Sequence, residues 1–264
     1  MPPAGVPAPA PRSNTGRTCL TAALAVVGAL ALLGGGGLLS HAYSNASQSI
    51  PNRSEFGPSM WRNEPVDKIF PEALADKQDA QSDTADRKRA QWHRIGISDK
   101  TGCDEGLSSA IAAEAKKLGC KAVLRATYVD PTGNTVATVA VIVLPKGDTA
   151  KNKMGDFFSY EQDKHSTRDQ VKAFGVPRTL AARWNDAARN GSHGDTVTEM
   201  NLPYALSAST GAADGRKAGK LPGEWGRHAT GDAESDRSPW EGAAMTLVDL
   251  MNAHLGDLLL KETP

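Results

Sequence analysis

An uncharged stretch near the N-terminus constrains this chain more than any other feature of its sequence. Residues 18–52 contain no Asp, Glu, Lys or Arg, and Cys19–Leu39 consists almost entirely of Leu, Ala, Val and Gly. As a helix, this segment would rise about 32 Å, close to the roughly 30 Å hydrocarbon core of a bilayer. A helix that is apolar all round needs complete burial in water, whereas in lipid its backbone hydrogen bonds are satisfied internally. We therefore expect a transmembrane helix over 19–40.

The charges on either side of this stretch predict its orientation. Arg12 and Arg17 precede it, and the next charged residue is Arg53. Because positive residues favour the cytoplasmic side, we expect residues 1–18 to form a cytoplasmic tail and the part after the helix to be extracytoplasmic. The chain would then be a single-pass protein of the cell membrane that contacts the lipid bilayer through 19–40.

The alternative is a cleavable signal peptide. Small residues near Ala42 or Ala46 suit a cleavage site, and cleavage there would release the domain as a secreted protein. An apolar region of about 20 residues is longer than the roughly 7–15 that are typical of signal peptides, which favours the uncleaved anchor. Both interpretations export the same domain.

Two cysteines in the exported part predict a disulfide bond. Cys103 and Cys120 would lie where disulfides persist, and closing a loop of this size would contribute roughly 3 kcal/mol to stability. The segment between them predicts a helix over 104–118, with an apolar stripe of Leu107, Ile111, Ala115 and Leu118. Because this helix would be about 22 Å long, the strand that follows must fold back over it for the bond to form. No C-x-x-C or His-Cys spacing indicates a redox or metal role.

Composition divides the exported part into a stalk and one folded domain. Residues 41–60 are rich in Ser, Asn, Pro and Gly, which is typical of a flexible stalk. We expect a single extracytoplasmic domain over 61–264, since its structured part falls within the usual size of one domain. Within it, 75–90 is almost without apolar residues and 211–237 is rich in Gly and charge, so both are interpreted as flexible loops.

The hydrophobic pattern predicts an α+β fold. Its clearest element is a hairpin over 121–129 and 135–144, in which Pro131 presets one turn residue and Gly133 supplies a positive φ. The helix that begins near Ser238 is equally well specified, because Pro follows at its first position and Glu completes a capping box. The other predicted elements are a helical turn within 61–74, strands at 92–97, 171–176 and 197–209, and a helix at 149–162.

Together these elements predict one small domain with a mixed or antiparallel sheet of about five strands, in a β-α-β-β-α-β-like order. Two or three helices would cover one face of this sheet. The last helix would pack on the sheet through an apolar stripe of Ala244, Leu247, Val248, Met251, Leu255 and Leu258.

Charge and motif content exclude several classes of function. The chain has 30 Lys+Arg and 30 Asp+Glu, so no nucleic-acid partner is expected. The sequence contains no G-x-S-x-G, H-E-x-x-H, G-x-G-x-x-G, H-x-H or C-x-x-C motif. Residues 215–220 resemble a phosphate-binding loop, but the spacing is one residue short and Leu221 stands where Ser or Thr is needed. We therefore assign no catalytic residue, no cofactor and no metal ligand.

Several polar residues are interpreted without a function. Ser192, His193 and Asp195 are the residue types of a catalytic triad, but neighbours on one Gly-containing loop cannot converge, so they predict a polar turn. Arg125 and His93 lie in predicted strands and are expected to face outward, since an inward charge would need a partner.

The acidic run near the C-terminal helix and two tryptophans complete the candidates. Asp232, Glu234 and Asp236 alternate like calcium ligands but lack the Gly turn and the final Glu of a calcium loop, so they predict a solvated loop. Trp184 and Trp225 fall in predicted loops, where packing is the default and an exposed ring would offer a contact for a partner or glycan.

The order of these signals can be stated as a pattern: W-R-x-x-P-x-x-x-x-F-P at 61–71, W-x-R-I-G at 92–96, Cys103 and Cys120, L-R-A-T-Y-x-D at 124–130, and A-D-G-R at 213–216 after Tyr204. This pattern resembles uncharacterised single-pass membrane proteins of actinobacteria, particularly of the streptomycete type, with an extracytoplasmic α+β domain. The resemblance would cover about 60–260. It implies the location and the paired cysteines, and no activity, ligand or catalytic residue.

Two hypotheses of different class follow. The first is a non-enzymatic binding or accessory domain of the cell envelope, anchored in the membrane, with an envelope protein as its partner. The second is a secreted or anchored hydrolase without a recognisable motif, which would use His165, His193, His228 or His254 with nearby acids. The second requires one of these His side chains within hydrogen-bond reach of a carboxylate or nucleophile inside a cleft.

Overall fold

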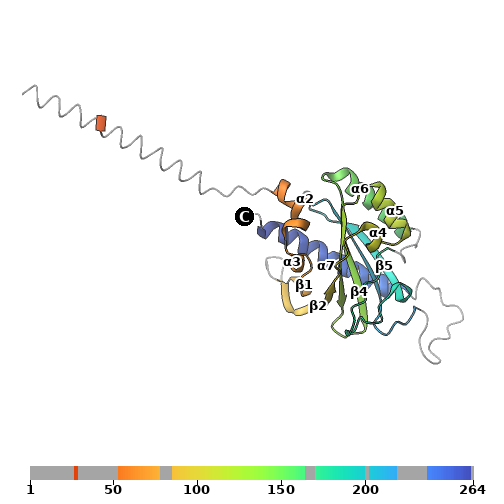
Figure 1. Cartoon of the computed structure of the whole chain (residues 1–264). Coiled ribbons are helices and arrows are strands. Elements are labelled where there is room, and N and C mark those ends of the chain that lie inside the picture. Colours follow the sequence, from red (N-terminus) through yellow and green to blue (C-terminus); the bar gives the residue numbers. More distant parts are fainter. Residues whose placement is uncertain are drawn as a thin grey trace, which may run out of the picture. The chain divides into compact units, whose positions relative to one another are not determined.

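The computed structural model describes residues 27–28, 53–77, 85–163, 170–199, 202–218 and 237–262. Its helices are α2 (Arg53–Asn63), α3 (Val66–Ile69), α4 (Cys103–Gly106), α5 (Ser109–Lys117), α6 (Asp148–Asp163), the short 3-10 helix η2 (Asp186–Ala188) and α7 (Ser238–Glu262). Its strands are β1 (Ala73–Lys77), β2 (Ala85–Ile97), β3 (Ala122–Val129), β4 (Thr135–Val143), β5 (Arg189–Thr196) and β6 (Tyr204–Ala212). The strands form one antiparallel sheet in the order β1-β2-β3-β4-β6-β5 (Figure 1).

The α+β class is confirmed, with six antiparallel strands instead of about five. The predicted transmembrane helix over 19–40 lies outside the described residues, apart from Val27 and Gly28. None of the helices in the described ranges is both long and apolar enough to cross a bilayer.

Helices cover both faces of the sheet, whereas the sequence pattern predicted helices on one face. Along β4, Val139 and Val141 belong to the cluster that includes α7, while Ala140 and Ile142 belong to the cluster that includes α5 and α6. Figure 1 shows α7 on one side of the sheet and α5 and α6 on the other. The reason is visible in the residues of β3 and β4, which are apolar almost without interruption. A strand with that pattern is buried on both faces, while strict alternation marks a strand with one solvated face.

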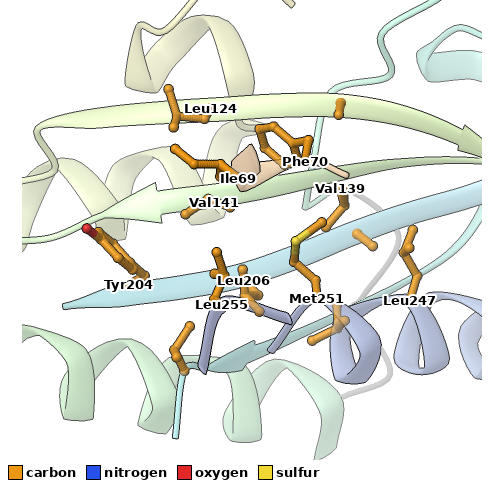
Figure 2. Packing of buried hydrophobic residues seen from close by; sticks show 14 of the residues in the cluster. Ile69, Phe70, Leu124, Val139, Val141, Tyr204, Leu206, Leu247, Met251 and Leu255 are labelled. Atoms are coloured by element: carbon orange, nitrogen blue, oxygen red, sulfur yellow. The ribbon is translucent and has the colours of Figure 1, made fainter. Parts of the chain in front are cut away.

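The helix α7 builds the larger core. Its predicted apolar stripe is confirmed, because every member is buried: Ala244, Leu247, Val248, Met251, Leu255 and Leu258. Figure 2 shows Leu247, Met251 and Leu255 directed toward Val139, Val141 and Leu206 of the central strands. Burial of this stripe stabilises the domain, at about 25 cal/mol per Å² of apolar area removed from water.

The predicted stalk is wrong in its second half. Residues 53–60 belong to α2, which packs on the domain with Gly57 and Met60 buried. The Tyr204 hydroxyl donates a 2.6 Å hydrogen bond to the Gly57 carbonyl and accepts one of 3.3 Å from the Trp61 amide. Phe56 and Met60 stand four residues apart and share one helix face, a spacing that a composition rich in Ser and Pro conceals. The remainder of the predicted stalk, 41–52, lies outside the described residues.

The predicted loop over 75–90 is also wrong where it is described. Its residues 75–77 belong to β1 and its residues 85–90 to β2, and the two strands pair with two shifts of register. Backbone pairing satisfies the N–H and C=O groups of a strand whatever its side chains are, so a polar composition does not exclude it. Residues 78–84 lie outside the described ranges.

The predicted helix over 104–118 is interrupted. The helix α4 is followed by a break at Leu107 and Ser108, and the helix α5 begins after this break. The break follows Gly106, where an added Cβ would lie 2.5 Å from a methyl group of Val123, so the short first helix rests directly on β3. This turn of the chain brings Cys103 within a Cα separation of 6.5 Å of Cys120, and the predicted disulfide is present.

The hairpin of β3 and β4 and the helix α6 agree with the sequence pattern, but the edge of the sheet does not. The expected polar turn at 192–195 is part of β5. The strand expected over 197–209 begins only at Tyr204 and continues to Ala212, into the expected loop. Gly is unfavourable in strands, yet here it is required, because a Cβ at Gly191 would lie 2.6 Å from the backbone nitrogen of Glu241 in α7. The rest of the predicted loop over 211–237 is described only as far as residue 218.

Candidate functional site

A row of hydroxyl groups crosses the sheet on the face opposite α7. The pairing register places Thr127 of β3, Thr138 of β4, Ser209 of β6 and Ser192 of β5 side by side. All four are buried. A row of this kind inside a domain needs partners, because an unpaired buried hydroxyl costs free energy.

The partners of Thr127, Thr138 and Ser209 come from residues 170–176, which we call the strap. Its Phe174 amide donates to Thr138 Oγ1 at 3.0 Å, and Thr127 Oγ1 donates to the Phe174 carbonyl. At its other end the Val171 amide donates to Ser209 Oγ at 3.2 Å, and that hydroxyl donates back to the Val171 carbonyl. The strap was predicted as a strand over 171–176. It is not one, because its backbone groups bond to side chains of several strands, and only Val171 forms an isolated bridge.

Arg125 is buried beneath the strap, which corrects the expectation that it faces outward. Its guanidinium donates to the Lys172 carbonyl at 3.0 Å and to Ser98 Oγ at 3.4 Å. Burial lowers the pKa of this group, and the nearby carboxylates of Asp186 and Glu105 act in the opposite direction. The strap carbonyl is the partner that an inward-facing arginine needs. His93, the other charged candidate in a strand, is exposed as expected.

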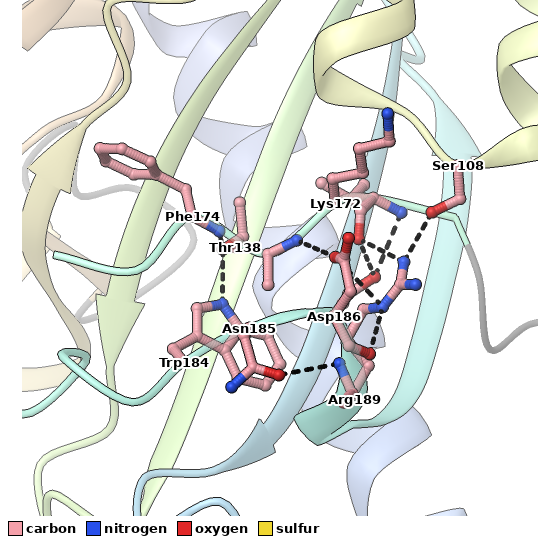
Figure 3. Close-up of polar contacts among 12 residues, drawn as sticks. Ser108, Thr138, Lys172, Phe174, Trp184, Asn185, Asp186 and Arg189 are labelled. Carbon is pink, nitrogen blue, oxygen red and sulfur yellow. Dashed lines mark hydrogen bonds and ion pairs between the residues drawn. The ribbon is translucent and has the colours of Figure 1, made fainter.

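A second set of contacts fixes the return of the chain after the strap (Figure 3). The indole Nε1 of Trp184 donates to Thr138 Oγ1 at 2.7 Å. Asp186 accepts a hydrogen bond of 2.8 Å from the Ala173 amide, and Arg189 donates to the Val171 carbonyl at 2.9 Å. Trp184 is therefore a packed residue, as the default interpretation held. Trp225 lies outside the described residues.

Between the strap and Trp184 the chain makes a tight loop, residues 176–183, which we call the cover loop. Gly175 directly precedes this loop, and an added Cβ there would lie 2.6 Å from the Trp184 carbonyl oxygen. Arg178 has a φ of 62°, a left-handed conformation that non-Gly residues rarely adopt. The Thr179 hydroxyl donates to the Val176 carbonyl at 2.7 Å and accepts from the Ala181 amide at 3.1 Å. The cover loop is thus held in a defined, locally strained shape, a condition that is common at ligand sites.

The cover loop forms one wall of an open cavity of about 390 Å³. The opposite walls are the turn between β3 and β4 and the residues that follow β6. The side chains that line the cavity include Asn134, Leu180, Arg183, Ala213, Asp214 and Arg216. Two arginines, one carboxylate and a side-chain amide thus meet beside an exposed leucine.

The two arginines differ in their surroundings. Arg216 Nε lies 2.7 Å from Asp214 Oδ2, and the Arg216 amide donates to the other oxygen of Asp214 at 3.0 Å. The hydrogen bond from that amide is the main reason that the pKa of Asp214 is lowered. Arg183 is exposed, and only its carbonyl is engaged, by Asn185 Nδ2 at 2.7 Å. Within the described part of the chain, its guanidinium has no partner.

A second cavity, of about 360 Å³, lies on the other side of the β3–β4 turn. It is lined by Trp92, Asp130 and Thr246, among others. The Asp130 carboxylate is already engaged within its own turn, by the Thr132 hydroxyl at 2.6 Å and the Thr135 amide at 2.8 Å. This cavity offers a ligand fewer free polar groups than the first.

The histidines named in the hydrolase hypothesis do not assemble a catalytic pair within the described residues. His165 and His228 lie outside those residues. His193 accepts a 3.3 Å hydrogen bond from Gln162, and His254 donates one of 2.7 Å to the Lys68 carbonyl. Burial lowers the pKa of both rings. Among the residues that the structure describes, no carboxylate or hydroxyl is hydrogen-bonded to either ring.

The triad residue types on β5 point in different directions. Adjacent residues of a strand face opposite sides of the sheet, so Ser192 and His193 cannot act on one substrate atom. Ser192 is buried on the face of the sheet that carries the strap, and its hydroxyl has no hydrogen-bond partner in the described part of the chain. Across the described ranges, no three His, Cys, Asp or Glu residues are arranged to hold a metal ion. Asp232, Glu234 and Asp236 lie outside those ranges.

Sequence reasoning did not find the cavity. Of the lining residues, the sequence pattern singles out Gly133 as a turn residue and A-D-G-R at 213–216 as a motif, and neither predicts a shared cavity. Arg183 and Arg216 are far apart in the sequence, and only the strap and the order of the strands bring them to one end of the sheet.

No family model, curated protein or solved structure matches this chain in comparisons with known proteins. The function proposed below therefore rests on geometry and chemistry.

Proposed function

We propose that this protein is a membrane-anchored binding domain of the cell envelope that holds its ligand in the cavity beneath the cover loop. The observation that carries this proposal is the position of the cavity. It lies at the opposite end of the sheet from the point where the N-terminal segment joins the domain.

The two ends of β4 define this polarity. The strand begins at Thr135, next to Asn134 in the cavity, and ends at Val143, which pairs with Tyr204. Tyr204 in turn holds Gly57 of α2, the first helix of the domain. Nine strand residues span about 30 Å, so the cavity and the start of α2 lie at opposite ends of the sheet.

The uncharged segment 19–40 and the arginines that precede it support anchoring with the domain outside the cell. The disulfide between Cys103 and Cys120 supports the same location, because such bonds persist in oxidising compartments.

The chemistry of the described site favours binding over catalysis. The hydroxyl row is covered by the strap, and the ionisable side chains that line the cavity among the described residues are Arg183, Asp214 and Arg216. Arginine does not exchange protons at physiological pH, and Asp214 is paired. These groups are suited to holding a ligand in a fixed orientation.

A topology experiment on the full chain tests the proposal. The chain would be expressed in a bacterium with a C-terminal tag, and spheroplasts would be treated with protease. We expect the tag to be digested from outside while the chain stays with membranes in high salt and alkaline carbonate. A matched variant lacking 19–40 should leave the tag protected in the cytosol. Recovery of the full-length chain from the cytosol, with Cys103 and Cys120 both reactive toward thiol reagents, would overturn the proposal. The mass of the membrane-bound product distinguishes an uncleaved anchor from cleavage near Ala42 or Ala46.

A further inference from the structure

We propose that the cavity beneath the cover loop binds a carboxylate, held between the guanidinium groups of Arg183 and Arg216, with the small apolar group next to that carboxylate packed on Leu180. This inference names the ligand class for the binding site proposed above and rests on that proposal.

Arg216 is oriented in advance for such a ligand. Asp214 engages its Nε, and the backbone of Arg216 is fixed on both sides of the peptide unit. Its amide donates to Asp214, and its carbonyl accepts a 2.9 Å hydrogen bond from Asn190 Nδ2. A guanidinium is a planar fork of five donors, so with Nε taken, the outer Nη edge is left for a second anion. Two parallel hydrogen bonds from that edge match the two oxygens of a carboxylate.

Arg183 supplies the opposing charge from a fixed backbone. It directly precedes Trp184, whose indole is bonded to the middle of β4 and whose amide donates to the Ala181 carbonyl at 3.1 Å. Its guanidinium is exposed and has no described partner, although it lines the cavity. The entropy cost of placing this cation near a ligand is reduced because the chain that carries it is held at both ends.

The apolar part of the cavity narrows the ligand class further. Leu180 is 59% exposed, and it lies over the β3–β4 turn, where a Cβ added to Gly133 would be 3.3 Å from Leu180 Cδ1. Ala182 and Ala213 also line the space. An exposed leucine beside two arginines fits a ligand that carries a small apolar group next to its carboxylate, such as the C-terminal residue of a peptide. A free inorganic anion would leave that wall unused.

The net charge of the site favours an anion. Two guanidinium groups face one carboxylate, and that carboxylate is bound on the Nε side of Arg216. The amide of Asn134 adds a neutral donor at the same wall. The cavity volume of about 390 Å³ falls within the range of roughly 300–1,000 Å³ that is usual for small-ligand sites.

The test is a binding titration of the full chain in nanodiscs with three probes. N-acetyl-alanine carries a carboxylate next to a methyl group, N-acetyl-alaninamide is the same molecule without the charge, and inorganic phosphate is an anion without the apolar group. We expect saturable binding of N-acetyl-alanine by calorimetry, and at least roughly tenfold weaker binding of the other two.

Variants locate the site. R183Q and R216Q should each weaken binding of N-acetyl-alanine by at least roughly tenfold. R216K keeps the charge but loses the fork, and should weaken it by a smaller factor. R178Q is the matched control, because it removes the same charge from the cover loop at a residue that does not line the cavity. An unchanged unfolding temperature confirms that each variant is folded.

Each contrary outcome is specific. Equal binding of the amide would overturn the assignment of a carboxylate, and phosphate binding as tight as N-acetyl-alanine would make the site a general anion site. Wild-type affinity in both R183Q and R216Q, or an equal loss in R178Q, would overturn the assignment of the two arginines. Because anchoring is measured separately by protease treatment, a chain that is anchored but does not bind N-acetyl-alanine contradicts this inference alone.

Discussion

The indole nitrogen of Trp184 is hydrogen-bonded to Thr138 Oγ1 at 2.7 Å, which ties the end of the cover loop to the centre of the sheet. The same hydroxyl accepts from the Phe174 amide and lies 3.0 Å from Thr127 Oγ1. One threonine thus joins the strap, the cover loop and two strands. The shape of the cavity depends on this contact, since Arg183 directly precedes Trp184.

Replacing the Thr138 hydroxyl by a methyl group should lower the free energy of unfolding. T138V keeps the shape of the side chain but leaves the buried indole N–H and the Phe174 amide without their partner. We expect a loss of about 2–4 kcal/mol in the free energy of unfolding, measured with denaturant, since each orphaned buried donor costs about 1–3 kcal/mol. T149V, at an exposed position of α6, should change it by less than about 0.5 kcal/mol. A T138V protein as stable as the wild type would show that the strap is held by other contacts.

The two cysteines of the disulfide should contribute to the free energy of unfolding only as a bonded pair. C103S, C120S and the double variant should each lower the free energy of unfolding by about 3 kcal/mol, because either single change already removes the bond. The reducing agent dithiothreitol should destabilise the wild type to the same level and leave the double variant unchanged. C19S provides the control for loss of a cysteine as such. Additive losses in the two single variants would contradict a bond between these residues.

The half-buried ring of His193 predicts a dependence of stability on pH. Burial lowers its pKa from the ordinary value of 6.5. The groups around it are Asp195 on its own strand, Asp249 and Glu241 on α7, and Gln162 on α6. With a folded pKa below the unfolded one, the unfolded state binds the proton first. The stabilising contribution is therefore complete above about pH 6.5 and is lost as the pH falls through the folded pKa.

The measurement is the free energy of unfolding at about pH 7.5 and about pH 5.5. The wild type should lose more stability over this interval than H193Q, in which the titrating ring is absent. An equal pH dependence of wild type and H193Q would assign the effect to other groups.

Two glycines should respond in opposite directions to the same substitution. G175A places a methyl group 2.6 Å from the Trp184 carbonyl oxygen and should lower the free energy of unfolding by at least about 2 kcal/mol. G242A lies in α7 with open space around it and should raise that free energy by about 0.5–1 kcal/mol, as Ala does in a helix. The measurement is the unfolding temperature of the two variants. A shift of the same sign in both would contradict the close packing of Gly175 against the backbone of Trp184.

The elements that the sequence predicts well are those specified by neighbouring residues. The hairpin follows from Pro131 and Gly133 between two apolar runs, and α7 follows from an apolar stripe that is complete within one segment. The pairing of Cys103 with Cys120 followed from the presence of two cysteines in one predicted extracytoplasmic domain. In each case the decisive residues lie close together in the chain, so local physics is sufficient.

The strap and β5 could not be predicted in this way. Residues 171–176 have the composition of a strand, but their amides bond to hydroxyls on strands that come from distant parts of the sequence. β5 contains Gly191 because the backbone of α7 packs too close to this position for a side chain. The sequence of β5 alone does not show this contact. The convergence of Arg183 and Arg216 has the same origin, because it follows from strand order. The transmembrane helix over 19–40 stays a prediction.

The docking of α2 on Tyr204 bears on how far an anchored domain could travel. If all of residues 41–60 were a linker, it would span up to about 70 Å between the anchor and the domain, at roughly 3.5 Å per extended residue. The helix α2 begins at Arg53 and is hydrogen-bonded to Tyr204 of the sheet. At most the twelve residues 41–52 therefore connect the predicted transmembrane helix to the domain, and fully extended they span about 40 Å. Were the chain anchored through 19–40 as proposed, the domain would reach only those partners that lie within about 40 Å of the end of that helix.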